Sequence, residues 1–242
     1  MPETFLILLA GGVMLAAAIS DPKAVTLRWL RLAGIIALSM TGLAAYFAHG
    51  RAMIGLTSLL ILGQLAFVQV AYRNTQRLLA TLASACAIAT GTIFLNQLHE
   101  APILNFVLVS MISAAVMGIA LMDMLLGHAY LTASQMTMSP FMRLNRAVAV
   151  SMLLRAILSV VGTVVLQSHH PIEMFWNLYG LYVGTRWLVG LLVPGVFIYM
   201  AHDCIKRRAT QSATGILYVT GVLIFIGEII GLYVTSQTGL PV

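Results

Sequence analysis

Three charged residues, Arg155, Arg186 and Glu228, lie within long apolar runs of the sequence. An arginine at the centre of a bilayer costs at least about 2.5–3.5 kcal/mol, so both guanidinium groups should face the interior of a helical bundle. Glu228 is the expected partner of one arginine. The other arginine then needs a further acceptor, which could be a backbone carbonyl, water, Glu173, a neighbouring chain, or a ligand with carbonyl or anionic oxygens.

Aromatic residues surround Arg186 in the segment WNLYGLYVGTRWLVG. Tyr179, Tyr182 and Arg186 are spaced i, i+3 and i+7, so they project from one face of a helix. A quinone ring could stack on such a face while the arginine and a tyrosine hydroxyl bind its oxygens. We therefore predict a quinone site in which Glu228 relays the proton. Its residues are Arg186, Tyr179, Tyr182, Glu228 and Arg155. Helix packing through the glycines of this segment is the alternative.

A second polar group is expected near the cytoplasmic side of the membrane. The segment LMDMLLGHAYL carries a carboxyl, an imidazole and a phenol at the end of an apolar run, and a His-Asp pair ends another run. A carboxylate at the depth of Asp123 must be protonated, paired or open to water. The group is predicted to form a proton-access or docking surface, with ordinary interfacial residues as the alternative. Its members are Asp123, His128, Tyr130, His202 and Asp203.

Metal and haem chemistry have little support in the sequence. Cys86 and Cys204 match no metal or redox spacing. No apolar run carries two histidines a few turns apart, so haem b is not favoured, although histidine pairs near the membrane surface remain as alternative ligands. His169 and His170 with Glu173 are weak evidence for a metal site. We expect no metal and no covalently bound cofactor, with quinone as the candidate ligand. No nucleotide-binding or hydrolase motif is present.

Composition predicts the elements that position these groups. Of the 242 residues, 60% are hydrophobic and 8% are charged, and uncharged runs reach about 20 residues, the length that spans a bilayer. The sequence predicts an all-α, polytopic integral membrane helical bundle of about eight transmembrane helices. Their expected ranges are 4–20, 27–48, 52–72, 78–98, 102–127, 144–167, 174–201 and 212–235. The first is expected to be a retained helix, because it lacks the basic segment of a signal peptide.

Basic residues predict the orientation of the bundle. Ten lie in or beside the odd-numbered loops, against Arg51 alone on the other side. The positive-inside rule then places the odd loops in the cytoplasm and both termini outside. The formal net charge of +6 is a topology signal with anionic lipid as its partner, and nucleic-acid binding has no support. The ten are Lys23, Arg28, Arg31, Arg73, Arg77, Arg143, Arg146, Lys206, Arg207 and Arg208.

The chain has no room for a separate soluble domain, so residues 1–242 are expected to form a single transmembrane domain. Arg73-Asn-Thr-Gln and Arg208-Ala-Thr-Gln each precede a helix at a cytoplasmic hairpin. If this echo marks an internal repeat, the domain divides into two four-helix halves of the same orientation, 1–100 and 101–242.

The last apolar run, GVLIFIGEIIGLYV, resembles the closing helix of membrane-anchor subunits of the dimethyl sulfoxide reductase and NrfD-like type. The resemblance covers about ten residues and the topology, and Leu232 stands where those anchors lead us to expect a basic residue. It implies a cofactor-free subunit that holds quinone or quinol and exchanges electrons with iron–sulfur or haem partners.

Three functions are therefore open. The first is an integral subunit of a respiratory or redox complex that contacts quinone, at most a non-catalytic or quinone-reacting part of an oxidoreductase. The second is a small transporter or channel in which Glu228 and Asp123 are proton or cation stations. The third is a structural or assembly subunit whose charges clamp helices together. The first and third require other membrane or peripheral subunits, and the expected location is a cytoplasmic membrane of bacterial type.

Overall fold

The computed structural model describes residues 1–21, 24–48, 51–69, 72–98, 101–132, 137–168 and 172–242. Its elements in these ranges are helical. They are α1 (Pro2–Ile19), α2 (Leu27–Phe47), α3 (Arg51–Ala66), α4 (Arg73–Asn96), α5 (Ile103–Thr132), α6 (Ser139–Ser168), α7 (Ile172–Trp187), the π-helical turn η2 (Leu188–Leu192), α8 (Val193–Lys206) and α9 (Thr210–Thr238). The predicted all-α bundle is confirmed.

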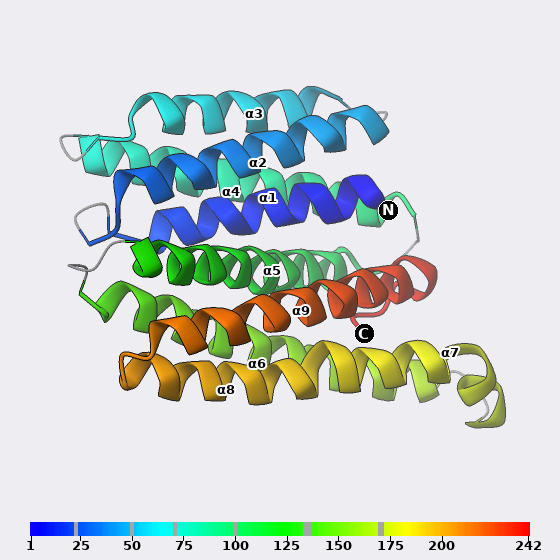
Figure 1. The fold of residues 1–242 in the computed structure, drawn as a ribbon. Helices are drawn as coiled ribbons and strands as arrows, with labels where there is room; N and C mark the ends of the chain where they lie inside the picture. Colours follow the sequence, from blue (N-terminus) through cyan, green and yellow to red (C-terminus); the bar gives the residue numbers. More distant parts are fainter. Residues whose placement is uncertain (22–23, 49–50, 70–71, 99–100, 133–136, 169–171) are drawn as a thin grey trace.

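The helices lie roughly antiparallel in one elongated bundle, and both chain termini lie at the same end of it (Figure 1). We call this the terminal end. The opposite end, called the basic end, holds the connections α1–α2, α3–α4, α5–α6 and α8–α9 (Figure 1). The ten basic residues named above belong to these connections or to the adjoining helix ends, with Lys23 outside the described residues.

Seven helical segments of the described chain are long and apolar enough to cross a membrane. One of them is continuous from Met174 to Lys206 and combines α7, η2 and α8. α3 is shorter, and its 16 residues extend about 24 Å. Large apolar side chains on outer faces are exposed, for example Leu181 at 80% and Leu59 at 65%, as lipid contact requires.

Several predicted boundaries were wrong. α3 ends at Ala66 and not at residue 72, because the chain turns at Phe67, whose carbonyl accepts from the Gln69 N–H at 2.7 Å. α6 begins at Ser139, five residues before the predicted start. Pro140 is compatible with this start, because the first turn of a helix needs no intrahelical N–H donor. α5 continues to Thr132, so its polar residues lie within the helix.

The first four spans, α1 to α4, and the last four, α5, α6, the continuous α7–η2–α8 segment and α9, have the same pattern of neighbours. α1 contacts α2 and α4, and α3 contacts α2 and α4; likewise α5 contacts α6 and α9, and α8 contacts α6 and α9. The division into halves stays a prediction.

α1 and α5 pack at Gly12 and Gly118, where a β-carbon on Gly12 would lie 1.8 Å from the Ala114 carbonyl oxygen. Small residues at this contact let the two backbones approach closely.

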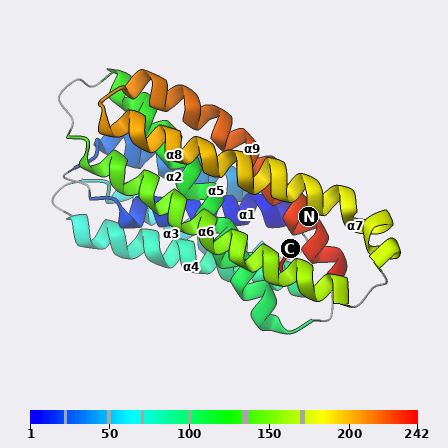
Figure 2. The ribbon, with the colours of Figure 1, turned by 90° about the horizontal axis from the view of Figure 1, so that it is seen from below.

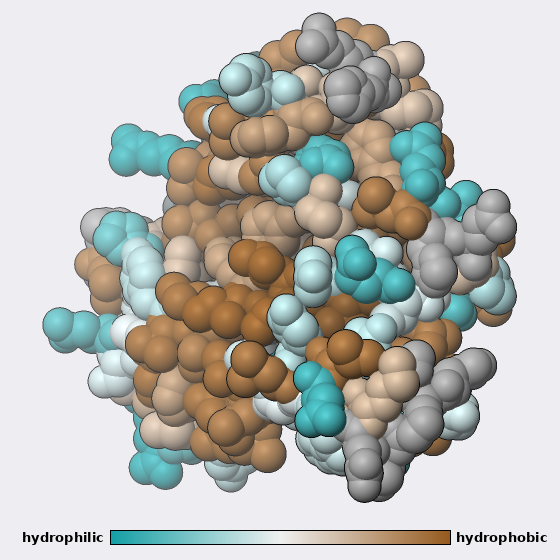
Figure 3. Space-filling view, turned by 90° about the vertical axis from the view of Figure 1, so that its right-hand side faces the viewer, coloured by the Kyte–Doolittle hydropathy of each residue, from teal (hydrophilic) through white to brown (hydrophobic). Residues whose placement is uncertain are grey.

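α6 and α8 are neighbours in the bundle, and the terminal end is partly polar. From below, α6 and α8 run alongside each other over much of their length (Figure 2). The terminal end, seen face on, carries scattered polar side chains around an apolar area (Figure 3). A polar and charged rim at each end of an apolar bundle is the distribution expected for a protein that crosses a bilayer.

Candidate functional site

The three deep charges meet in one buried cluster, which confirms the predicted ion pairing. Arg186 Nη2 lies 2.7 Å from Glu228 Oε1, and Arg155 Nε lies 3.2 Å from the same oxygen. All three residues are fully buried. They come from α6, α7 and α9, so the cluster links three helices within the half of the bundle nearer the terminal end. A single carboxylate serves two guanidinium groups.

The second acceptor for the arginines comes from the end of the described chain. Gly239 ends α9 with a left-handed φ of 68°, and the segment after it turns back against the bundle. The Val242 main-chain oxygen accepts from Arg155 Nη2 at 2.9 Å, and Val242 is fully buried. Of the acceptors proposed for the extra arginine, the structure therefore contains a backbone oxygen. The Glu173 side chain lies outside the described part.

Glycines explain how two guanidinium groups fit beside α9. A β-carbon on Gly231 would lie 2.8 Å from Arg155 Nη2, 3.1 Å from Arg186 Nε and 3.0 Å from the Val242 oxygen. A β-carbon on Gly227 would lie 2.9 Å from Arg186 Nη1 and 2.3 Å from the α-carbon of Gly190. Gly190 lies in η2, and π-helical turns are frequent at functional sites. The Gly-Glu-Ile-Ile-Gly segment thus holds the carboxylate and makes room for its two partners.

The tyrosines predicted to hold a quinone lie beside this cluster on α7. The Tyr182 ring contacts the Tyr233 ring of α9, with centroids 5.4 Å apart, and Tyr179 packs against Phe175 at 6.3 Å. Tyr182 is 38% exposed, whereas Arg186 is fully buried and bonded to Glu228. A ligand at the bundle surface can therefore reach the Tyr182 ring but not the Arg186 guanidinium group. Their role as a quinone site stays a prediction.

A second polar group crosses from α5 through α6 to α8. Asn145 Nδ2 donates to Asp123 Oδ2 at 3.2 Å, and Asn145 Oδ1 lies 3.2 Å from His202 Nδ1. Since the amide oxygen can only accept, His202 Nδ1 must carry the proton in this contact. Neutral His202 then offers Nε2 as an acceptor. Asp123 is fully buried, and its Oδ1 has no hydrogen-bond partner among the described residues.

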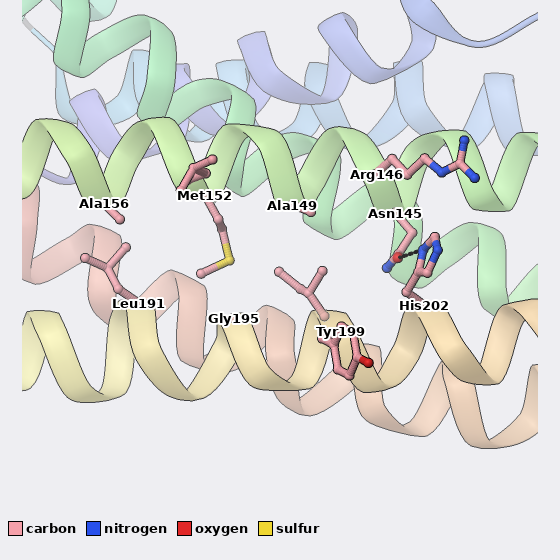
Figure 4. A pocket seen from close by; sticks show the side chains of 11 residues that line it. Asn145, Arg146, Ala149, Met152, Ala156, Leu191, Gly195, Tyr199 and His202 are labelled. Carbon is pink, nitrogen blue, oxygen red and sulfur yellow. Dashed lines mark hydrogen bonds between the residues drawn. The ribbon is translucent and has the colours of Figure 1, made fainter.

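An open groove of about 500 Å³ lies between α6 and α8 and ends at this polar group. In the close view, Met152 and Leu191 extend into the space between the two helices, and the hydrogen-bonded Asn145 and His202 close one end of it (Figure 4). Tyr199, 76% exposed, stands on its outer edge. The lining residues are Asn145, Arg146, Ala149, Met152, Leu153, Ala156, Leu191, Gly195, Ile198, Tyr199 and His202.

The other members of the predicted cytoplasmic surface do not join this polar group. The Tyr130 hydroxyl donates to the Thr137 carbonyl, and its ring stacks on Phe141. Asp203 accepts from Arg207 at 2.8 Å on the surface, and His128 is exposed. Among the described hydrogen bonds of these five residues, those through Asn145 join Asp123 to His202, whereas Tyr130 interacts with Asp123 only through electrostatics.

Sequence reasoning missed Asn145 and the groove. Asn145 is the second residue of the predicted helix 144–167 and lies close to Arg143 and Arg146, so it resembles an ordinary interfacial residue. Its depth in α6 became visible only when the helix was found to start at Ser139. A signal was available nevertheless, since a buried carboxyl at Asp123 required a donor from a neighbouring helix.

Comparison with known proteins found no matching family model, no matching curated protein and no matching solved structure. The resemblance of the last helix to dimethyl sulfoxide reductase and NrfD-like anchors therefore stays a prediction. The chain is a polytopic, all-helical membrane protein with an ionic cluster and an amphipathic groove.

Proposed function

We propose that the protein is an integral membrane subunit of a redox complex and that it binds a quinone or quinol in the groove between α6 and α8. The supporting observation is the polarity of the groove. Its wall is apolar along the bundle axis, and its end toward the basic end is a hydrogen-bonded Asn145–His202 pair. Pockets for ring-shaped cofactors are mostly apolar, with a few polar groups that fix the orientation of the ligand.

The tail of such a ligand would lie along apolar side chains and leave the groove toward lipid. Leu153 on the outer edge is 63% exposed, so the groove opens on the outer surface of the bundle. A volume of about 500 Å³ falls in the range of about 300–1,000 Å³ typical of small-molecule sites. A quinone can therefore enter from the membrane and place its ring near the polar end.

The polar end offers the proton chemistry that quinol oxidation needs. A quinol loses two electrons and two protons when it becomes a quinone. His202 Nε2 can accept one proton when the ring is neutral, and water in the open groove can accept the second. The Asp123 carboxyl lies one hydrogen-bonded residue behind His202. The electrons would pass to an iron–sulfur or haem centre of a partner subunit. On this proposal the basic end faces the cytoplasm of a cell of bacterial type.

The sequence predicts a quinone ring against Arg186 and the neighbouring tyrosines, and this placement is the alternative to the groove. Arg186 is fully buried and binds Glu228 at 2.7 Å, so a quinone oxygen could reach its remaining N–H donors only if the packed helices moved apart. The groove requires no such movement, because it is open. The groove is therefore the placement that we favour.

Short-chain quinones test this proposal in detergent micelles through the quenching of tryptophan fluorescence. Ala149→Phe fills the groove and should abolish saturable quenching. Val150→Phe is the matched control, because Val150 is the next residue, is 59% exposed and does not line the groove. Unchanged quinone affinity in Ala149→Phe, together with loss of quinone binding in Arg186→Lys, would show that the ring binds at the ionic cluster and not in the groove. Absence of saturable quenching in the unmodified protein would refute quinone binding.

The partner subunits are tested by extraction in mild detergent and identification of the proteins that stay attached. Attached iron–sulfur or cytochrome subunits would support the redox proposal. Isolation as a homo-oligomer would instead favour the transport alternative, in which Asp123 and Glu228 act as proton or cation stations.

A structural role is the second candidate, and the ionic cluster favours it. Arg155, Arg186 and Glu228 join α6, α7 and α9 through contacts of 2.7 and 3.2 Å. Such a clamp would fix the helices that frame the groove. If quinone binding fails while partner subunits still co-purify, this assembly role is the better account.

A further inference from the structure

Several buried polar atoms around the ionic cluster have no hydrogen-bond partner from the described protein. We call this set the polar column. It consists of Arg155 Nη1, Arg186 Nε and Nη1, and the hydroxyl oxygens of Ser110, Ser159 and Thr235. The five side chains are fully buried and belong to α5, α6, α7 and α9; of these helices, α5 contacts α6 and α9, and α7 contacts α6 and α9.

Other hydroxyls on the same helices behave differently. Ser151 on α6 donates to the Val148 carbonyl at 2.9 Å, and Thr220 on α9 donates to the Ile216 carbonyl at 2.8 Å. This bond to the preceding turn is the usual way in which serine and threonine are satisfied inside a membrane helix. Ser159 and Thr235 lack it although they lie on the same two helices. Their hydroxyls are therefore available to a ligand.

The polar column extends from the cluster toward the terminal end. Ser159 follows Arg155 by one turn of α6, and Thr235 follows Gly231 by one turn of α9. From Glu228 to Thr235 the rise is about 10 Å, and Thr235 lies three residues before the end of α9. The column thus covers about 10 Å of the roughly 15 Å of α9 between Glu228 and the last residue of the helix at the terminal end.

The chemistry of the set selects the ligand. Guanidinium groups only donate, whereas hydroxyls both donate and accept. Water accepts from the former and donates to the latter, so it can join all members and satisfy polar groups that would otherwise be buried without a partner. We propose that the polar column holds a chain of ordered water molecules that connects the Arg155–Arg186–Glu228 cluster with the aqueous phase at the terminal end. This path gives the Glu228 carboxylate access to protons from that side. The inference does not depend on the quinone groove.

Solid-state NMR on protein labelled with nitrogen-15 arginine in liposomes tests the inference. Magnetisation transfer from water to the guanidinium groups is measured, and Arg155→Lys and Arg186→Lys assign their signals. Both signals should gain intensity from water as early as the signal of Arg207, whose side chain is 74% exposed. The proposal is overturned if the Arg155 and Arg186 signals gain no intensity from water by the time the Arg207 signal has reached its full intensity.

Matched substitutions locate the water. Thr235→Val removes a hydroxyl of the column at nearly constant volume and should cause loss of early water transfer to Arg186. Thr220→Val removes a helix-bonded hydroxyl on the same helix and should leave that transfer unchanged. Ser159→Ala with Ser151→Ala as control repeats the comparison on α6, should Thr235→Val fail to assemble. Equal effects in column and control variants would contradict the assignment.

Discussion

Replacing Glu228 with glutamine is the most informative single change to the ionic cluster. The carboxylate contacts both Arg155 Nε and Arg186 Nη2, at 3.2 and 2.7 Å, and all three side chains are almost fully buried. The glutamine amide keeps the shape but removes the charge, so both buried guanidinium groups lose their counter-ion. Breaking a buried pair in this way costs about 3–5 kcal/mol. For a chain of this size, each kcal/mol corresponds to about 2–4 °C, so we expect the Tm to fall by about 6–20 °C.

The assay is thermal unfolding in detergent micelles, with Asp203→Asn as the control. Asp203 also pairs with an arginine, at 2.8 Å, but the side chains are 50% and 74% exposed, so the loss should be below about 1 kcal/mol. Adding Arg186→Met to Glu228→Gln should recover part of the stability, because it removes one uncompensated charge. If Glu228→Gln cost no more than Asp203→Asn, the cluster would not be the clamp that we describe.

Three further predictions concern the glycine contact at Gly231, the hydrogen bond between Asn145 and Asp123, and the topology. Gly231→Ala should destabilise the protein by about 1–3 kcal/mol in the same assay, since its β-carbon would lie 2.8 Å from Arg155 Nη2. Gly215→Ala, with open space around it, should be neutral or stabilising, and equal effects of the two substitutions would refute the contact. Asn145→Leu should cost about 1–3 kcal/mol and weaken quinone quenching, because it leaves the Asp123 carboxyl without its donor; normal affinity in this variant would remove Asn145 from the site. Lys206→Cys, in a background without the native cysteines, should be labelled only from the cytoplasmic side of sealed vesicles, and labelling from outside would overturn the orientation.

Much of the fold was predictable because a membrane imposes simple constraints. Long uncharged runs had to be helices, and the boundary errors arose where tertiary contacts or a turn decided the end. The pairing of Glu228 with one of the arginines Arg186 and Arg155 was predictable for the same reason, since apolar surroundings force opposite charges together. That one carboxylate contacts both arginines was not predicted. The second acceptor of Arg155, the Val242 main-chain oxygen, was not predictable, because its position depends on how the segment after Gly239 folds back.

The groove and the Asp123–Asn145–His202 hydrogen bonds could not be derived from the periodicity of the sequence. The groove depends on the spacing and relative rotation of α6 and α8, which a single sequence does not specify. The π-helical turn η2 shifts the register within one apolar run, so Gly190 meets Gly227 at a place that a regular helix would not predict. Asn145 was overlooked because its polarity suited a position at the membrane surface equally well.

Photolabelling with an azido-quinone, followed by mass spectrometric mapping, tests the central claim most directly. We predict label on α6 between Asn145 and Ala156 and on α8 near Tyr199, and we predict that excess unlabelled quinone removes it. Competable label on Tyr179 or Tyr182 of α7 would contradict the groove and return the ring to the ionic cluster, and the absence of competable label would contradict quinone binding altogether.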